Sequence, residues 1–314
     1  MNDCIARRGH DFNLLDPICL PVTPGMDVVG QVVEVGDQVT EFGPGDRVAT
    51  LVKSGGNARY ISVPASSLVK VPRNLSSDEA VCMVSVYMTA YKCLRMISTA
   101  ENGSGLSLKG KKVFVVGGGD PVAQALVHLC NKAKASKIYV SAPSSLHNFV
   151  KSSLRATPVL LEESEWPDKV KGEMDFVFDG RCANVSASKA CLNNEGKLVI
   201  FGMASMLNDR EMGVLGAPMS ARMTKMNNGL RWSTQSLDLW ESFQKDPKAY
   251  KTNLADLFQL LKWQKIKPPI AGRVGLSQVA GAQDIIESME VRGVIVCLPW
   301  KRTLPGRNKN KNRS

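Results

Sequence analysis

The chain has 314 residues, of which 44% are apolar and 22% are charged, and its formal net charge is +11. This length allows one large domain or two, and the composition is typical of a soluble globular protein. No apolar run approaches the roughly 18 residues that a membrane-spanning helix needs, and the first residues hold no apolar core of a secretory signal. We therefore predict a cytoplasmic protein with no transmembrane segment, unless a targeting segment precedes this sequence.

The positive charge is concentrated at the end of the chain. Residues 301–314 contain six Lys or Arg residues and no acidic residue, so the remaining 300 residues carry a net charge of only +5. This segment has no apolar periodicity, which predicts a disordered, solvated tail. We expect no specific nucleic-acid partner.

The eight cysteines are scattered along the chain, and no two of them form a Cys-x-x-Cys pair. Such scatter favours free thiols in a reducing compartment over a zinc ribbon or a dense disulfide framework. The three histidines, His10, His128 and His147, form no ligand pattern either. The sequence therefore predicts no metal site.

Residues 1–75 are rich in strand signals that glycine and proline interrupt. The segment from Met1 to Pro24 is expected to be loop-rich. The strands expected after it are short, and together they predict part of a β-barrel. They lie within Pro24–Val48, with turns at Gly30, Gly36 and the corner Gly43-Pro44-Gly45, and at Asn57–Pro64 and Val69–Pro72.

The most informative unit of the central region is a strand, a glycine turn and a helix. The apolar run Val113–Val116 predicts a buried strand, Gly117–Gly119 predicts the turn, and apolar residues at helical spacing continue to Leu129. In a Rossmann unit such glycines let a diphosphate approach the N-terminus of the helix. The signal is impaired here, because Asp120 places a carboxylate where a diphosphate would lie and Pro121 removes one N–H. By itself, this stretch fits an ordinary tight turn equally well.

Strands and helices are predicted to alternate after this unit, as in a parallel sheet flanked by helices. A helix that opens at Asp78 and continues through Leu94 precedes the unit. A later helix around Leu254–Leu261 ends at the Pro268-Pro269 pair. The further strands are expected at Lys137–Val140, Asp175–Phe178, Lys197–Phe201 and Val294–Leu298.

Together these features resemble the medium-chain dehydrogenase/reductase superfamily, in its zinc-independent quinone oxidoreductase and enoyl reductase branch. The resemblance extends nearly to Trp300 and is most specific over Pro24–Val48. The segments Val22–Met26 and Gly202–Ser205 are most similar to the vesicle amine transport protein relatives of that branch. Further support comes from Thr89-Ala90-Tyr91, Asp175, Asp179-Gly180, Gly196–Gly202 and Ile266-Lys267-Pro268.

The resemblance implies an α/β fold, in which a Rossmann parallel-sheet domain is joined to an incomplete GroES-like β-barrel domain with the active cleft between them. Asp3–Gly9 matches a family motif near that cleft, and relatives carry further residues before it. We therefore expect the first barrel strands to be missing. Ile5 stands where some quinone reductases carry a tyrosine. The implied domains are residues 1–92 (GroES-like catalytic domain), 93–263 (Rossmann nucleotide-binding domain), 264–300 (return to the GroES-like domain) and 301–314 (disordered basic tail).

Zinc independence follows from the same comparison. Zinc-dependent members carry Gly-His-Glu where this chain has Gly25-Met26-Asp27, and a thioether beside a carboxylate does not replace the histidine ligand. The four-cysteine structural lobe is absent as well. Asp27 and Asp46 are interpreted as residues that fix turns.

The implied cofactor is NADPH. No acidic residue ends the second predicted strand to bind an NAD ribose, whereas the hydroxyls of Ser144 and Ser145 suit a 2′-phosphate. The lysine that relatives often carry here falls on Leu146, so we expect NADPH binding to be weak or lost. The implied cofactor-binding residues are Thr89, which would lie beneath the nicotinamide, with Gly117, Gly118, Gly119, Val122, Ser141, Ser144, Ser145, Phe201, Gly202 and Met203. No catalytic residue is assigned.

Two functions agree with this pattern. The first is an NADPH-dependent oxidoreductase that reduces a quinone or an α,β-unsaturated carbonyl compound by hydride transfer. The second is a non-catalytic family member with a degenerate nucleotide site that acts as a binding or scaffold protein. Asp120, Leu146 and Ile5 favour the second function, whereas the retained glycine turn and Gly202 favour the first, which we prefer. Relatives commonly pair through the edge of the Rossmann sheet, so a homodimer is a further expectation.

Overall fold

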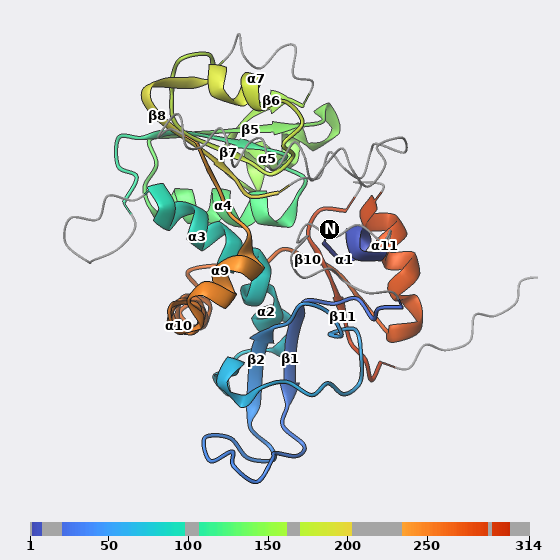
Figure 1. The fold of residues 1–314 in the computed structure, drawn as a ribbon. Helices are drawn as coiled ribbons and strands as arrows, with labels where there is room; N and C mark the ends of the chain where they lie inside the picture. The colour runs from blue at the N-terminus through green and yellow to red at the C-terminus, as the bar shows by residue number, and fades with distance from the viewer. Residues whose placement is uncertain are drawn as a thin grey trace, which may run out of the picture.

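The computed structural model describes residues 2–7, 21–97, 107–161, 170–202, 234–287 and 291–301. Its largest element is a six-stranded parallel sheet with the strand order β6-β5-β4-β7-β8-β9. A three-stranded sheet, β1-β2-β3, and a two-stranded sheet, β10-β11, lie at the opposite end of the molecule (Figure 1). This arrangement confirms the predicted fold class of a Rossmann-like sheet joined to a smaller β-rich domain.

The central strand of the parallel sheet is covered on both faces. Val113 and Val115 of β4 belong to one buried cluster, and Phe114 and Val116 belong to the cluster on the other face. This alternation confirms the prediction of a buried strand, because successive side chains of a strand point to opposite faces. The strands are β4 (Lys112–Val116), β5 (Lys137–Ala142), β6 (Thr157–Leu160), β7 (Met174–Asp179), β8 (Leu192–Ile200) and β9 (Thr234–Ser236).

Helices cover both faces of this sheet. On one face α4 (Pro121–Lys132), the helix expected after the glycine turn, packs against α3 (Met88–Ile97), which also contacts α10 (Pro247–Lys262). On the other face α7 (Val185–Ala190) packs against the second buried cluster. Two further short helices, α5 (His147–Ser152) and α9 (Leu239–Lys245), complete the layers of this domain.

The helix expected from Asp78 to Leu94 forms, but it is not a regular α-helix throughout. Between α2 (Ser77–Cys82) and α3 lies a π-helical segment, η2 (Met83–Tyr87), in which the Val84 carbonyl accepts a hydrogen bond from Tyr250 Oη at 2.7 Å. By length and hydropathy the run Ser77–Ile97 matches a membrane span, but 61% of its apolar 18-residue window is buried inside the protein, as in a core helix. A single such helix is weak evidence for a span.

The N-terminal sheet pairs β1 (Asp27–Gln31) antiparallel with β2 (Arg47–Leu51), and β2 antiparallel with β3 (Val69–Lys70). Two expectations were wrong here. Gly30 does not turn the chain, because it lies within β1 opposite Val48. The range 57–64 forms no strand, because the side chains over 59–62 are all exposed and leave no face to bury against a sheet.

Gly25 shows why the stretch before β1 is distinctive. Its φ is +108°, and a Cβ at this position would lie 2.4 Å from the backbone nitrogen of Asn57. The Pro24 and Gly25 carbonyls accept hydrogen bonds from the Asn57 and Gly56 N–H groups, both at 2.9 Å. Only glycine permits this conformation together with such a close approach of two backbone segments.

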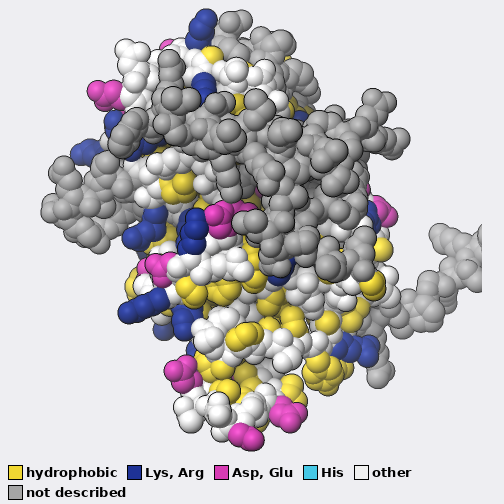
Figure 2. Space-filling model, viewed as in Figure 1, with side chains coloured by type: hydrophobic (Ala, Val, Ile, Leu, Met, Phe, Trp, Pro, Cys, Tyr) yellow, Lys and Arg dark blue, Asp and Glu magenta, His cyan; other side chains and the backbone are white. Residues whose placement is uncertain are grey.

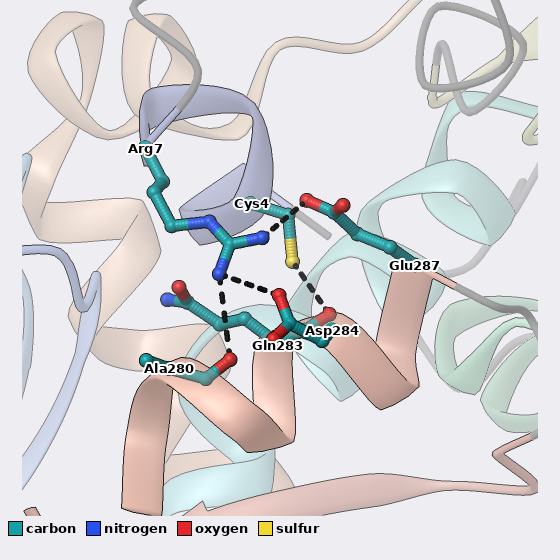
Figure 3. A network of polar contacts seen from close by, with 6 residues as sticks. All are labelled: Cys4, Arg7, Ala280, Gln283, Asp284 and Glu287. Carbon is teal, nitrogen blue, oxygen red and sulfur yellow. Dashed lines mark hydrogen bonds and ion pairs between the residues drawn. The ribbon is translucent and has the colours of Figure 1, made fainter. Parts of the chain in front are cut away.

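The loop-rich interpretation of the first residues was wrong over Asn2–Arg7, which forms helix α1. No glycine or proline interrupts these residues, with Asp3 in the first turn and Arg7 in the last, as the helix dipole favours. Arg7 binds α11 (Val279–Glu287) through Asp284 at 2.9 Å, Glu287 at 3.0 Å and the Ala280 carbonyl at 3.3 Å (Figure 3). Helix α11 lies between the parallel strands β10 (Ile270–Val274) and β11 (Val294–Cys297) in sequence.

Hydrophobic side chains remain exposed near the small sheets. Figure 2 shows them on the lower part of the viewed face, where Figure 1 places β1, β2 and β11. Tyr60 and Trp300 are 68% and 60% exposed, and their rings meet edge to face with centroids 5.5 Å apart. The Arg59 guanidinium lies 5.1 Å from the centre of the Trp300 ring, so a cation–π contact covers part of this patch.

Candidate functional site

The candidate site lies at the carboxyl ends of the parallel strands, where the strand order reverses. From β4 the chain continues to β5 and β6 on one side of the sheet and then returns to β7 on the other side of β4. In open α/β sheets, ligands bind outside the strand ends at such a switch point. The loops that follow β4, β5, β7 and β8 therefore define the site.

The glycine turn after β4 crosses the neighbouring strand β5 at close range. Gly117 has φ = +94°, and a Cβ on Gly118 would lie 2.3 Å from Val140 Cγ1. The Gly117 N–H donates to Ser141 Oγ at 3.0 Å, and the Gly118 N–H donates to the Ser141 carbonyl at 2.8 Å. The fully buried Ser141 thus fixes the turn from below.

The N-terminus of α4 is capped by its own carboxylate. Asp120 Oδ1 accepts the N–H of Val122 at 2.7 Å and that of Ala123 at 3.4 Å. Burial raises the pKa of Asp120, while these two hydrogen bonds act to lower it. The carboxylate therefore occupies the N–H groups that a diphosphate would use, in the place that the sequence indicated.

The loop after β5 offers hydroxyls but no cation. Ser144 and Ser145, the first residues of the short helix η3 (Ser144–Leu146), are exposed. Leu146, where the resemblance led us to look for a lysine, is only 6% exposed. Its Cδ1 would lie 3.4 Å from a Cβ on Gly119, so this side chain packs against the glycine turn.

The loops after β7 and β8 touch through two glycines. A Cβ on Gly180 would lie 2.7 Å from the Phe201 ring, and a Cβ on Gly202 would lie 2.6 Å from the Gly180 carbonyl oxygen. The Phe201 N–H donates to the Asp179 carbonyl at 3.0 Å. These residues therefore form one compact corner of the site, whereas Met203 lies outside the described residues.

Thr89 approaches the sheet from the helical layer. It lies in α3, which contacts both α4 and β8, and is 8% exposed. Val122 lies in the first turn of α4 and packs against the buried cluster of the same layer. The structure thus gathers the ends of β4, β5, β7 and β8, with α3 and α4 beside them.

Asp46 and Asp27, which were both expected to fix turns in the smaller domain, differ in their hydrogen bonds. Asp46 Oδ2 accepts the Gly43 N–H at 3.2 Å and so fixes a turn, as expected. Asp27 does not fix a turn through its side chain: Oδ2 accepts a hydrogen bond from Ser85 Oγ at 2.7 Å, and Oδ1 is buried without a partner. Burial raises the pKa of Asp27 to about 7, against the lowering effect of the Ser85 hydrogen bond.

Arg181 is a site residue that the sequence analysis missed. Two residues past the end of β7, its side chain lies over Gly117, with Cγ 3.3 Å from the position that a Cβ there would take. The sequence did contain a signal for this residue. Arg181 is the first basic residue after the strand that ends at Asp179, and ligands bind at the carboxyl ends of such strands.

No group of three or more His, Cys, Asp or Glu side chains that could hold a metal occurs within the described part of the chain. Met26 is half-buried and packs against the main buried cluster. The seven described cysteines are free thiols. Zinc independence remains a prediction, which elemental analysis of the purified protein tests directly.

Two family models match the chain. Residues 2–73 match the alcohol dehydrogenase GroES-like domain, and residues 154–297 match the zinc-binding dehydrogenase family. The first segment contains the small antiparallel sheet and α1, and the second contains the parallel strands β6 to β9 together with β10 and β11.

The sequence is also similar to individual proteins. The human synaptic vesicle membrane protein VAT-1 homolog is 30% identical over 210 residues, which cover 65% of this chain and 51% of that protein. A quinone oxidoreductase-like protein 2 homolog of Nematostella vectensis is 26% identical over 289 residues, 88% of this chain and 73% of that protein. The chain thus spans about half the length of the VAT-1 relative.

Solved structures show the same fold. A native mycobacterial structure complexed with NADPH superposes with a TM-score of 0.70 at 22% identity, over 90% of this chain and 84% of that one. With both domain models and these relatives in agreement, the chain belongs to the medium-chain dehydrogenase/reductase superfamily, and its relatives support the quinone oxidoreductase branch.

Proposed function

We propose that the chain is an NADPH-dependent oxidoreductase that reduces a quinone or an α,β-unsaturated carbonyl compound. The observation that carries this proposal is the glycine turn of β4 at the switch point of the sheet, beside the contact of Gly180 with Phe201 and Gly202. Quinone oxidoreductase-like relatives and the NADPH complex of a structural neighbour support the same substrate class and cofactor.

The backbone at this site fits a dinucleotide, with one departure. Gly117 and Gly118 add no side chain of their own to the turn, as the close approach of a diphosphate requires, and the Arg181 side chain crosses the turn at Gly117. The departure is Asp120, whose carboxylate already accepts the N–H groups of Val122 and Ala123. We therefore propose that NADPH binds, but more weakly than at a helix N-terminus with free N–H groups.

The residues of the site would then act by positioning. The exposed hydroxyls of Ser144 and Ser145 would donate hydrogen bonds to the 2′-phosphate, and Thr89 with the Phe201–Gly202 corner would bound the nicotinamide end. A bound nicotinamide supplies the hydride, and the chain supplies orientation and the exclusion of water. A solvent proton can complete the reduction, so this function needs no dedicated acid. A homodimer and a cytoplasmic location belong to the same proposal.

Turnover measurements test the function. Purified protein should oxidise NADPH faster than NADH when a panel of quinones and enones is supplied, as followed by the loss of nicotinamide absorbance. Saturable NADPH binding without turnover on any member of the panel would favour the binding or scaffold role. The absence of both binding and turnover would contradict the proposed function.

A further inference from the structure

Arg181 lies where a ligand on the glycine turn would have to pass. Its Cγ and Cδ lie 3.3 Å and 3.6 Å from the position that a Cβ on Gly117 would take, so the stem of the side chain crosses the turn at contact distance. The residue is half-exposed. A cation on a half-exposed stem can both reach a ligand and remain partly solvated when the site is empty.

The backbone that carries Arg181 is held in place by a buried carboxylate. Asp179, 1% exposed, accepts the N–H groups of Arg181 at 2.8 Å and Cys182 at 2.9 Å through Oδ1, and the Ser188 hydroxyl at 2.7 Å through Oδ2. Cys182 has the unusual φ of +53°, which this clamp stabilises. The Arg181 position is therefore a built feature of the loop after β7.

Four backbone N–H groups near Arg181 already donate hydrogen bonds within the protein. Asp120 takes two N–H groups of α4, and Ser141 takes those of Gly117 and Gly118. In the described loops that follow β4, β5, β7, β8 and β9, Arg181 is the single Lys or Arg residue. Within these described loops, Arg181 is thus the one cation that can interact with an anionic ligand, close to the fixed carboxylate of Asp120.

We propose that Arg181 binds the diphosphate of the dinucleotide, an inference that rests on the proposed function. Arg181 would replace the N-terminus of α4, whose N–H groups Asp120 already occupies. The sheet order separates the two anionic groups of NADPH. The 2′-phosphate belongs beyond β5, at Ser144 and Ser145, whereas Arg181 extends from the β7 side of β4. The diphosphate crosses the switch point between them, and a guanidinium suits its paired oxygens.

Binding of two ligand fragments shows whether Arg181 contacts the diphosphate or the 2′-phosphate of NADPH. ADP-ribose carries the diphosphate, whereas adenosine 2′-monophosphate carries only the other phosphate. Arg181→Met keeps the length of the stem and removes the charge, and Arg181→Lys keeps the charge without the fork of donors. We expect Arg181→Met to raise the Kd of NADPH and ADP-ribose at least about tenfold and to leave that of adenosine 2′-monophosphate within about twofold, with Arg181→Lys intermediate. The salt dependence of NADPH binding should become shallower in Arg181→Met.

Lys189→Met is the matched control, because it removes an exposed cation from the neighbouring helix α7. It should leave all three affinities unchanged, and unchanged melting temperatures should show that the variants fold. Equal loss for both fragments, or no loss for either, would overturn the assignment to the diphosphate. Tighter binding by Arg181→Met would show that the side chain obstructs the turn, which also overturns it. If the wild-type protein binds neither NADPH nor ADP-ribose, the proposed function itself fails.

Discussion

Asp27 is the described carboxyl group whose environment opposes its charge most clearly. One oxygen is buried without a partner, the other accepts the Ser85 hydroxyl, and the nearby Asp3 adds like charge. Burial raises its pKa from 3.8 to about 7. The folded protein therefore holds this proton between about pH 4 and pH 7, whereas the unfolded chain releases it. The contribution of Asp27 to stability is fully present below pH 4 and is lost as the pH rises to 7.

Replacement of Asp27 should expose this dependence. We expect Asp27→Asn to raise the free energy of unfolding at pH 8, by up to roughly 4 kcal/mol for a shift of about three pKa units, and to change it little at pH 4. Denaturant unfolding of both proteins at the two pH values measures the difference.

Asp46 provides the control of opposite sign. Asp46 is surface-exposed, and its pKa is lowered mainly by the side-chain hydrogen bond from Lys70 and further by the hydrogen bond from the Gly43 N–H. The contribution of Asp46 to stability is present above its unfolded pKa and is lost as the pH falls, so Asp46→Asn should slightly destabilise the protein at pH 8.

The opposite result for Asp27 would contradict this interpretation. If Asp27→Asn were less stable than the wild-type protein at pH 8, the Asp27 carboxylate would have to be stabilised by a contact other than those described.

At the scale of the elements, the connection from β4 to α4 depends on one residue without a side chain, Gly118. Gly118 passes β5 so closely that an added Cβ would lie 2.3 Å from Val140 Cγ1 and 3.3 Å from the Ser141 carbonyl oxygen. Gly118→Ala should therefore displace the turn or the strand and destabilise the protein by about 1–3 kcal/mol. Gly36→Ala is a suitable control, because no atom lies within 4 Å of its Cβ position and its φ is not positive. Equal melting temperatures for the two variants would contradict the observed packing of the turn.

At this scale the sequence predicted the long, periodic elements well. β4, β5, β7, β11 and the helix after the glycines follow from apolar runs and 3.6-residue spacing, because those patterns report burial directly. The errors fell where tertiary contacts decide. The range 57–64 has strand-like composition but no face to bury, and Asn2–Arg7 becomes a helix that Arg7 anchors to α11 far along the chain.

The backbone of the candidate site could be predicted from the sequence, but the positions of its charged side chains could not. The glycines identified the turn and the switch point, since close backbone approach requires glycine. Arg181 was missed because its place over Gly117 depends on the sheet order and on the Asp179 hydrogen bonds, neither of which appears in sequence spacing. Asp27 was interpreted as fixing a turn because its partner, Ser85, lies 58 residues away.

On the scale of the whole molecule, we propose that the carboxyl edge of the parallel sheet binds a dinucleotide although the Asp120 carboxylate repels its diphosphate. Two like charges about 4 Å apart repel by roughly 1 kcal/mol in water and by about 4 kcal/mol at an effective dielectric of 20. The Asp120 carboxylate also takes up the favourable field of the α4 N-terminus, which contributes about 0.3–1 kcal/mol to binding of an anion. Removal of this carboxylate should therefore restore affinity, while glycine in its place costs the helix cap only a few tenths of a kcal/mol.

Equilibrium titration of NADPH fluorescence against the wild-type protein and Asp120→Gly measures this repulsion. We expect weak, saturable binding by the wild-type protein and binding at least about tenfold tighter by the variant, equivalent to about 1.4 kcal/mol. Because burial raises the pKa of Asp120, the wild-type affinity should also increase as the pH falls and this carboxyl group takes up its proton, and the variant should lose that dependence. Unchanged affinity in Asp120→Gly would contradict the role of the carboxylate, and no binding by either protein would contradict the nucleotide site.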